Sequence, residues 1–453
     1  MRLSLSPGPH SDALRQLTSC IIGANDPTGN LAHEAVSAVE MHLLQRHWPV
    51  GEALGALPEV QKDLGLGRPA CREALLILEA RGLLDVRRGP GGGLFVAAPT
   101  AEDVVGAMLT YLTLSGVGGH CIQEFRLLVW RMVVEAAIDR GFDAPAPVAS
   151  ASEWGFAVDL ALRIGNPAMA LAAQIAEMLV RTCEGRAAPA QDALLARAMR
   201  VRDTRQAIDR LDVLAHPTDL VAPIFALEAM EHSLARSGRK SAMALAARMS
   251  REMIHHPERL EAEWETADRL GYSDAAVRQA RRILQDFGVV RCQRGRKGAL
   301  WGPPTSPAGV IRLLAPCLIA SGMTAADNAE AANFLACNGP RLAAARTAQY
   351  GGPQTRVLAS YANSLEFIDL IRTENLILDL ACNPLLSIMT RSLGLANLLS
   401  PEAKISFHRR AEIVAINHRI LRAIEAGDAE AAGLLARSKG EIQKSEASYR
   451  KLA

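Results

Sequence analysis

The clearest pattern of apolar and polar positions lies in the stretch 64–84, LGLGRPACREALLILEARGLL. Its apolar residues at 71, 74, 75 and 78 recur at helical spacing, and Gly82 is typical of a helix end. Two short strand-like runs follow and are joined by a basic, glycine-rich turn. An amphipathic stretch, 32–48, and a short segment around PEVQKDLG precede it. The pattern predicts three helices followed by a β-hairpin.

The same pattern recurs 206 residues later, in the stretch 270–290, LGYSDAAVRQARRILQDFGVV. Eight of the 21 aligned positions are identical, and the match continues without a gap from RRGPGGGLFV to QRGRKGALWG. Over 64–94 against 270–300, 12 of 31 positions agree. We therefore infer an internal duplication, in which each copy carries three helices and a hairpin.

Three helices and a hairpin form a winged helix-turn-helix, whose third helix fits a DNA major groove and whose wing reaches a phosphate or the minor groove. Basic residues lie where such docking needs them. The alternative, a solvated helix face and a loop, describes most charge runs. The repeated helix–helix–helix–wing order favours nucleic-acid binding. The basic residues are Arg68, Arg72, Arg87 and Arg88 in the first copy, and Arg278, Arg281, Arg282, Arg291, Arg294, Arg296 and Lys297 in the second.

Composition narrows the class of protein. The 453 residues carry a net charge of only +2, so any basic surface is local. Eight scattered cysteines form no C-x-x-C pair, which favours a reducing cytoplasm over a zinc site or a disulfide scaffold. The first residues contain no apolar core of a signal peptide. The window 104–123 is uncharged, but its polar residues predict a buried bundle helix and no membrane span.

At these residues the chain resembles the GntR family of bacterial transcription regulators. The family pattern is Leu-Gly-x-Ser-Arg-x-x-Val-Arg-Glu-Ala-Leu followed by a glycine-rich wing; the first copy fits it closely and the second more loosely. The resemblance implies that Arg68 and Arg72 contact bases and phosphates, whereas Pro58 stands where the family often has an arginine. The expected DNA-contacting residues are Arg68, Pro69, Ala70, Arg72, Arg87, Arg88, Gly91, Gly92, Asp274, Arg278, Arg282, Arg294, Arg296 and Lys297.

The segments after each winged helix resemble the FCD effector domain of that family, an all-α bundle. EFRLLVWRMVVEAAIDR is similar to its opening helix, and FAVDLALRIGNPAM and TENLILDLACNPLL share an Asn-Pro pair. The predicted fold is therefore mainly α, a tandem repeat of winged helix and bundle. The expected boundaries are 1–29 for an N-terminal segment, 30–100 and 238–304 for the winged helices, 101–215 and 305–453 for the bundles, and 216–237 for a connecting helical segment.

Many members of that subfamily bind a divalent metal through one Asp and three His inside the bundle. Histidine is missing from the matching positions, and Ala, Leu and Lys cannot replace imidazole as a ligand. We therefore expect no metal and no cofactor. The resemblance also implies a small organic acid as effector, for which Arg126 is the candidate partner; a structural ion pair is its alternative role. The matching positions are Glu153, Ala157, Asp192 and Leu214 in the first copy, and Leu370, Glu374, Asn417 and Lys439 in the second.

Two DNA-binding winged helices, which we call readers, in one chain predict a pseudo-dimer that binds a near-palindromic DNA operator by itself. Self-association beyond the pseudo-dimer remains open. Asp274, which faces Arg68 in the alignment, has three explanations. We favour a helix N-cap, because YSDAAVRQA places Ser273 and Asp274 where a cap belongs; the others are a different half-site, or a second winged helix that has lost specific binding. A rival function is a protein-interaction scaffold with degenerate winged helices. The chain contains no recognisable catalytic motif, so we expect no enzyme.

Overall fold

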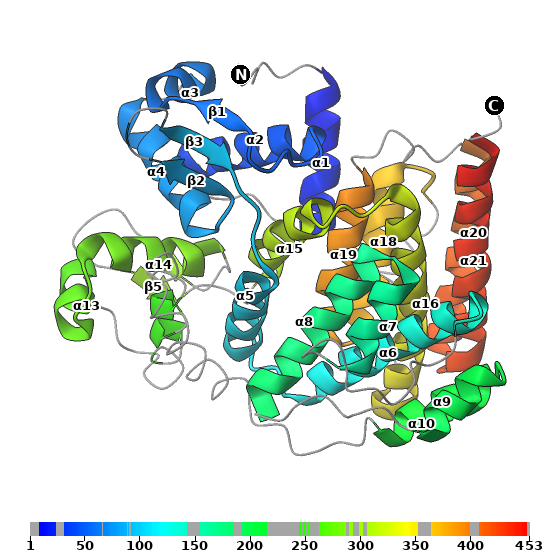
Figure 1. The fold of residues 1–453 in the computed structure, drawn as a ribbon. Coiled ribbons are helices and arrows are strands. Elements are labelled where there is room, and N and C mark those ends of the chain that lie inside the picture. The colour runs from blue at the N-terminus through cyan, green and yellow to red at the C-terminus, as the bar shows by residue number, and fades with distance from the viewer. Residues whose placement is uncertain are drawn as a thin grey trace.

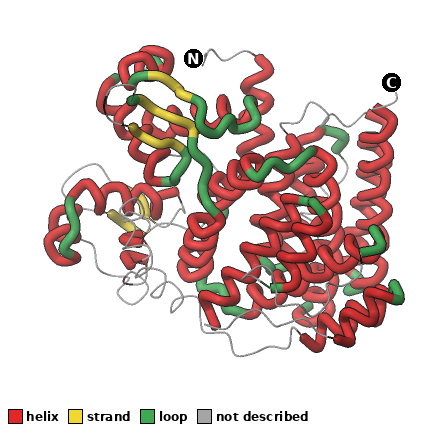
Figure 2. The backbone as a smooth tube through the Cα atoms, viewed as in Figure 1, coloured by secondary structure: helices red, strands yellow, loops and turns green. Residues whose placement is uncertain are grey.

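The computed structural model of the chain consists mainly of helices, with two small antiparallel sheets (Figures 1 and 2). This confirms the mainly α class that the sequence predicts. None of the described helices is long and apolar enough to cross a membrane. The structure describes residues 9–23, 31–65, 67–87, 89, 92–142, 155–184, 193–214, 244–246, 248–250, 252, 262–286, 290–292, 299–301, 306–351, 364–398 and 407–450.

The first winged helix contains three helices and a three-stranded sheet with the order β1-β3-β2. The sequence pattern predicted only the β2–β3 hairpin and missed β1, a three-residue strand ending at a glycine. β1 forms because Leu54 is buried and Ala53 pairs with Phe95 of β3. The elements are α2 (Leu31–Gln45), β1 (Ala53–Gly55), α3 (Leu57–Leu64), α4 (Arg68–Ala80), β2 (Leu84–Arg87) and β3 (Gly93–Val96).

A helical bundle follows the first winged helix. It begins with a capping box, in which the Thr100 hydroxyl accepts from the Asp103 amide and the Asp103 carboxylate accepts from the Thr100 amide. Residues 104–113 of α5 are all buried, as expected of a bundle helix. The helices are α5 (Ala101–Leu114), α6 (His120–Asp139), α7 (Phe156–Ile164), α8 (Pro167–Glu184), α9 (Ala193–Arg200) and α10 (Thr204–Leu214).

From residue 263 on, the described elements of the second half follow the order that begins at α3 in the first half, and no counterpart of β1 is described. Two helices and a hairpin, in which Val290 pairs with Trp301, precede another set of helices. The connecting segment 216–237 lies outside the described residues. The elements are α13 (Glu263–Leu270), α14 (Asp274–Asp286), β4 (Val290–Cys292), β5 (Ala299–Trp301), α15 (Ala308–Ala320), α16 (Ala325–Tyr350), α18 (Phe367–Leu380), α19 (Pro384–Leu398), α20 (Phe407–Glu425) and α21 (Ala429–Arg450).

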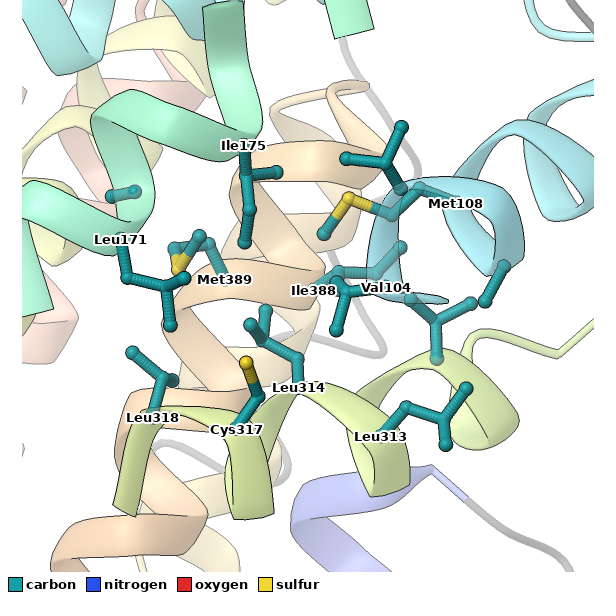
Figure 3. Packing of buried hydrophobic residues seen from close by; sticks show 14 of the residues in the cluster. Val104, Met108, Leu171, Ile175, Leu313, Leu314, Cys317, Leu318, Ile388 and Met389 are labelled. Atoms are coloured by element: carbon teal, nitrogen blue, oxygen red, sulfur yellow. The ribbon is translucent and has the colours of Figure 1, made fainter. Parts of the chain in front are cut away.

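The two sets of bundle helices share one hydrophobic core. α5 packs against α15 and α8, and α15 packs against α19. Figure 3 shows this junction, where Met108 of α5, Ile175 of α8, Leu314 of α15 and Met389 of α19 point toward one another. All four are almost fully buried. Neither set of helices therefore has a complete apolar core without the other.

The first described helix, α1 (Pro9–Ile22), packs against helices of the second half, α15, α18 and α19. The Asn375 side chain donates a hydrogen bond to the Cys20 carbonyl at 2.7 Å. The Cys20 thiol donates to the Ile368 carbonyl at 3.8 Å. These contacts tie the beginning of the chain to α18 across about three quarters of its length (Figure 1).

Candidate nucleic-acid interface

Helix α4 has one buried face and one exposed basic face. Cys71, Ala74 and Leu78 are fully buried against the winged-helix core, as their helical spacing predicts. Arg68 and Arg72 lie one turn apart on the exposed face. Neither guanidinium forms a hydrogen bond or ion pair with any described residue. The first copy thus presents two uncommitted positive charges on one helix face.

The first turn of α4 is built to begin the helix at Arg68. Gly67 is its N-cap with extended backbone dihedral angles, and Pro69 occupies a first-turn position, where its missing N–H costs no hydrogen bond. Pro69 is exposed and Ala70 is half-buried. Because the cap offers no side chain, the first-turn N–H groups of α4 have no side-chain acceptor at Gly67.

The wing lies at the end of the β2–β3 hairpin, beside the exposed end of β2. The Arg87 guanidinium is 3.5 Å from the Asp85 carboxylate and stacks over the Phe95 ring at 4.0 Å. Gly89 has a φ of 102°, which favours glycine, and its carbonyl accepts from the Gly92 amide at 2.8 Å. Arg88 and Gly91 lie outside the described residues.

A buried ion pair fixes α4's end in the first winged helix. Arg81 donates to Glu40 of α2 at 2.5 Å, and both side chains are less than one tenth exposed. Arg312 of α15 lies 3.8 Å from the same carboxylate. Glu40 therefore joins the first winged helix to a bundle helix of the second half. No sequence pattern indicated this contact, because its three residues lie far apart in the chain.

Among the described residues, polar residues of α14, the second predicted recognition helix, form contacts within the chain, unlike Arg68 and Arg72 of α4. Ser273 accepts a hydrogen bond from the Ala276 amide at 3.3 Å and is therefore the cap, whereas Asp274 is the first helical residue. Our assignment of the cap to Asp274 is wrong by one residue, although the carboxylate still lies where the helix dipole favours it. Arg278 donates to Glu263 at 3.2 Å. Arg294, Arg296 and Lys297 lie outside the described residues.

The two recognition helices contact each other. Arg282 of α14 forms an ion pair with Glu73 of α4 and donates to Gln285 at 2.9 Å. The Arg282 side chain is 21% exposed, so it is only partly available to a ligand. Arg281, which the sequence places among the basic residues, is buried and donates to Thr266. The second reader therefore offers fewer uncommitted charges than the first among the described residues.

The candidate effector residue, Arg126, lies inside the first bundle. Its guanidinium makes two contacts of 3.1 Å with Glu177 and stacks over Trp130, whose indole N–H also donates to Glu177 at 2.6 Å. Burial raises the pKa of Glu177, and the Arg126 charge opposes that shift. The structure thus gives Arg126 a partner within the chain.

The positions matched to the family's metal ligands are only partly described. Ala157 is buried and Leu214 is half-buried in the first half, while Glu153 and Asp192 lie outside the described residues. In the second half, Lys439 donates to Asn417 at 2.9 Å and forms an ion pair with Glu374. Within the described residues, no group of three or more His, Cys, Asp or Glu side chains is suited to a metal ion.

The two sets of bundle helices exchange matching contacts where α6 meets α16. Arg140, the C-cap of α6, forms an ion pair with Glu330 of α16 at 2.7 Å, and Arg346 of α16 forms one with Glu124 of α6 at 2.7 Å. The two glutamates, like the two arginines, are separated by the same 206 residues that separate the recognition-helix stretches.

Two asparagines extend this reciprocity. Asn166, which precedes α8, donates to the Asp327 carbonyl and to Glu330 in the first turn and a half of α16. Asn383, which precedes α19, donates to the Cys121 carbonyl and to Glu124 of α6. At an interface with two-fold symmetry, contacts occur in such reciprocal pairs, because the same surface is used on both sides.

The first described domain is thus a winged helix with an exposed basic face, a class of domain that binds DNA. Its residues 31–96 match the family model described as bacterial regulatory proteins, gntR family. The match covers α2 to β3 and indicates a DNA-binding transcription regulator. The comparisons with curated proteins and with solved structures returned no match.

Proposed function

We propose that the chain is a sequence-specific transcription regulator that presents two winged helices to DNA as a single-chain pseudo-dimer. The observation that carries the proposal is the pair Arg68 and Arg72, exposed and uncommitted on the recognition helix of a gntR-family domain. Exposed guanidinium groups on such a helix suit bidentate contacts with guanine or contacts with phosphate. In this proposal, Arg68 and Arg72 of the better-preserved winged helix contact one of the two DNA half-sites.

The pseudo-dimer part of the proposal is supported by the exchanged contacts of α6 and α16. Four ionic side chains and two asparagines are repeated at matching positions, as expected if two copies of one ancestral subunit now form one chain. A tandem duplication that includes FCD-like bundles explains this pattern. Tethering the copies makes pairing of the two readers independent of protein concentration.

In vitro selection of DNA with the intact chain tests the proposal. We expect a site with two differing half-sites, because Arg68 faces Asp274 in the alignment of the two readers. A single specific half-site flanked by arbitrary sequence would show that α14 contacts DNA through charge alone, without sequence specificity. Failure to enrich any sequence, with affinity independent of salt, would favour the protein-scaffold alternative over DNA binding.

The proposal includes control by a small organic acid that binds Arg126 in the first bundle. An organic acid that enters the first bundle would compete with Glu177 for the Arg126 guanidinium. A screen of small carboxylic acids by thermal shift tests this, with Arg126→Met as the matched variant. Stabilisation by an acid in the wild type, absent in the variant, supports the role; equal stabilisation of both excludes Arg126 as the contact. As a DNA-binding regulator, the protein would act in the cytoplasm.

A further inference from the structure

Three polar side chains from three helices meet in the second bundle, where those of Asn417 and Lys439 are buried and that of Glu374 is 36% exposed. Glu374 comes from α18, Asn417 from α20 and Lys439 from α21. The Lys439 ammonium donates to the Asn417 carbonyl oxygen at 2.9 Å and forms an ion pair with the Glu374 carboxylate. Asn417 is 1% exposed and Lys439 is 7% exposed. A charged amine is thus enclosed by the helices it connects.

The same residues, together with Leu370, stand at the positions where the resemblance places a divalent metal. Their chemistry does not fit a metal. While the Lys439 amine is protonated against the Glu374 carboxylate it has no lone pair to donate, and the buried Leu370 offers no ligand atom. The two oxygens that would suit a cation, from Glu374 and Asn417, already face the Lys439 nitrogen.

We propose that the Lys439 ammonium is the resident cation of the second bundle and holds α18, α20 and α21 together where a divalent ion would otherwise bind. An unpaired buried ammonium is costly, whereas one that meets a carboxylate and an amide oxygen is offset by them. Because this cation is covalently part of α21, it cannot dissociate. The second bundle is therefore closed without metal and does not respond to metal concentration.

Two opposing influences act on the lysine. Burial lowers the pKa of Lys439 to about 7, because a charged amine loses its hydration. The Glu374 carboxylate favours the protonated form, since opposite charges in contact stabilise each other. Asn417 accepts through its oxygen, while its Nδ2 group is buried without a hydrogen-bond partner among the described residues. The amide is therefore oriented toward the amine.

The first bundle contains a different buried charge pair. Its buried charge pair is Arg126–Glu177, which joins α6 to α8. At a spacing of 206 residues, Arg126 faces Ala332, so the second half has no equivalent guanidinium. Leu214 stands in the first half at the position matched to Lys439. An internal cation at the family's metal position is thus a property of the second bundle alone among the described residues.

A double-mutant cycle on the intact chain tests the structural part of the proposal. Lys439→Met keeps the length of the side chain and removes the charge, and Glu374→Gln removes the carboxylate. We expect each single variant to lower the Tm by about 5 °C or more, and the double variant to lose less than the sum. A higher Tm for Lys439→Met would show the amine to be a liability, and additive losses would show no pairing; either result overturns the proposal.

A gain-of-metal experiment tests the position itself and does not depend on DNA binding. The variant Asn417→His/Lys439→His supplies two imidazoles beside Glu374, a donor set that binds Co²⁺ and Ni²⁺. Co²⁺ titration followed by visible absorption should show one additional equivalent relative to the wild type, lost again when Glu374→Gln is added. No gain would mean that the three positions do not converge on one cation. Wild-type uptake abolished by Glu374→Gln would show that a metal already binds, and would also overturn the proposal.

Discussion

From α3 and α13 onward, the two halves of the chain carry the same order of described elements, but they differ in which residues match. At the α6–α16 contact, Glu124 and Arg140 in the first half match Glu330 and Arg346 in the second, side chain for side chain. On the helices that we propose to face DNA, Arg68 matches Asp274. Each residue of the reciprocal interface must remain complementary to a residue of the other half, whereas a residue that faces DNA in the proposed pseudo-dimer would serve one half-site only. The difference teaches where the two halves are free to diverge.

The buried pair Glu40–Arg81 gives the largest expected difference in stability between the halves. Arg81 faces Phe287 in the alignment, so the second half has no arginine at that position. Arg81→Met leaves the Glu40 carboxylate buried, with only Arg312 at 3.8 Å, and should destabilise the chain by about 3–5 kcal/mol. Chemical denaturation measures this loss.

The exposed pair Arg46–Glu52 is the matched control, since both side chains are more than one third exposed. Arg46→Met should cost less than about 1 kcal/mol. Similar losses in both variants would contradict a special role for the buried pair.

Removal of the two uncommitted arginines should have the next largest effect, on DNA affinity. Arg68→Ala/Arg72→Ala should weaken binding to the selected site about 100-fold, because each guanidinium contributes roughly 1–3 kcal/mol to base or phosphate contacts. Fluorescence anisotropy at fixed salt measures it. The paired variant Asp274→Ala/Arg278→Ala should change affinity less, since Arg278 is already bonded to Glu263. An equal loss in both variants would show two equivalent readers, and no loss in the first would contradict DNA reading by α4.

The two interface asparagines should respond alike. Asn166 accepts from the Met169 amide and Asn383 from the Leu386 amide, so each also caps its helix. Asn166→Ala and Asn383→Ala should each cost about 2 kcal/mol of stability, from the lost cap and the lost bonds to the other half. Denaturation under identical conditions compares them. A much larger loss in one variant than in the other would mean that the two matching asparagines do not contribute equally to stability.

The contact between the recognition helices should have the smallest effect. Glu73→Gln releases Arg282 and removes a negative charge near the DNA-facing surface. Affinity should rise by at most about fivefold, the equivalent of an exposed ion pair, with a slightly steeper salt dependence. The gain should vanish in an Arg282→Gln background. A loss of affinity would instead indicate that the pair positions the two helices for binding.

Local patterns predicted the local structure well. The spacing of Cys71, Ala74 and Leu78 predicted the buried face of α4. The polar residues of 104–123 predicted one buried helix; residues 104–113 are buried in α5, but the window then passes through a loop into α6. Both predictions follow from periodicity and polarity over a few turns. Strand β1 was missed because its three residues are specified by pairing with β3, not by their own composition.

Contacts between distant segments were beyond the sequence patterns. Nothing near Glu40 indicates Arg81 or Arg312, and nothing near Glu73 indicates Arg282, because such pairs depend on how whole helices pack. The reciprocal contacts had a usable signal: the 206-residue spacing of the repeat also separates Glu124 from Glu330 and Arg140 from Arg346. The position of the helix cap was ambiguous between Ser273 and Asp274, since both residue types cap helices.

The docking of α1 has a consequence for how the protein is made. Asn375, which holds the Cys20 carbonyl, is 355 residues further along the chain. A ribosome adds about 5–20 residues per second, so α1 emerges roughly 20–70 s before its docking surface exists. During that time α1 cannot dock. The first described helix can therefore dock only after α15, α18 and α19 have been synthesised, late in the making of the chain.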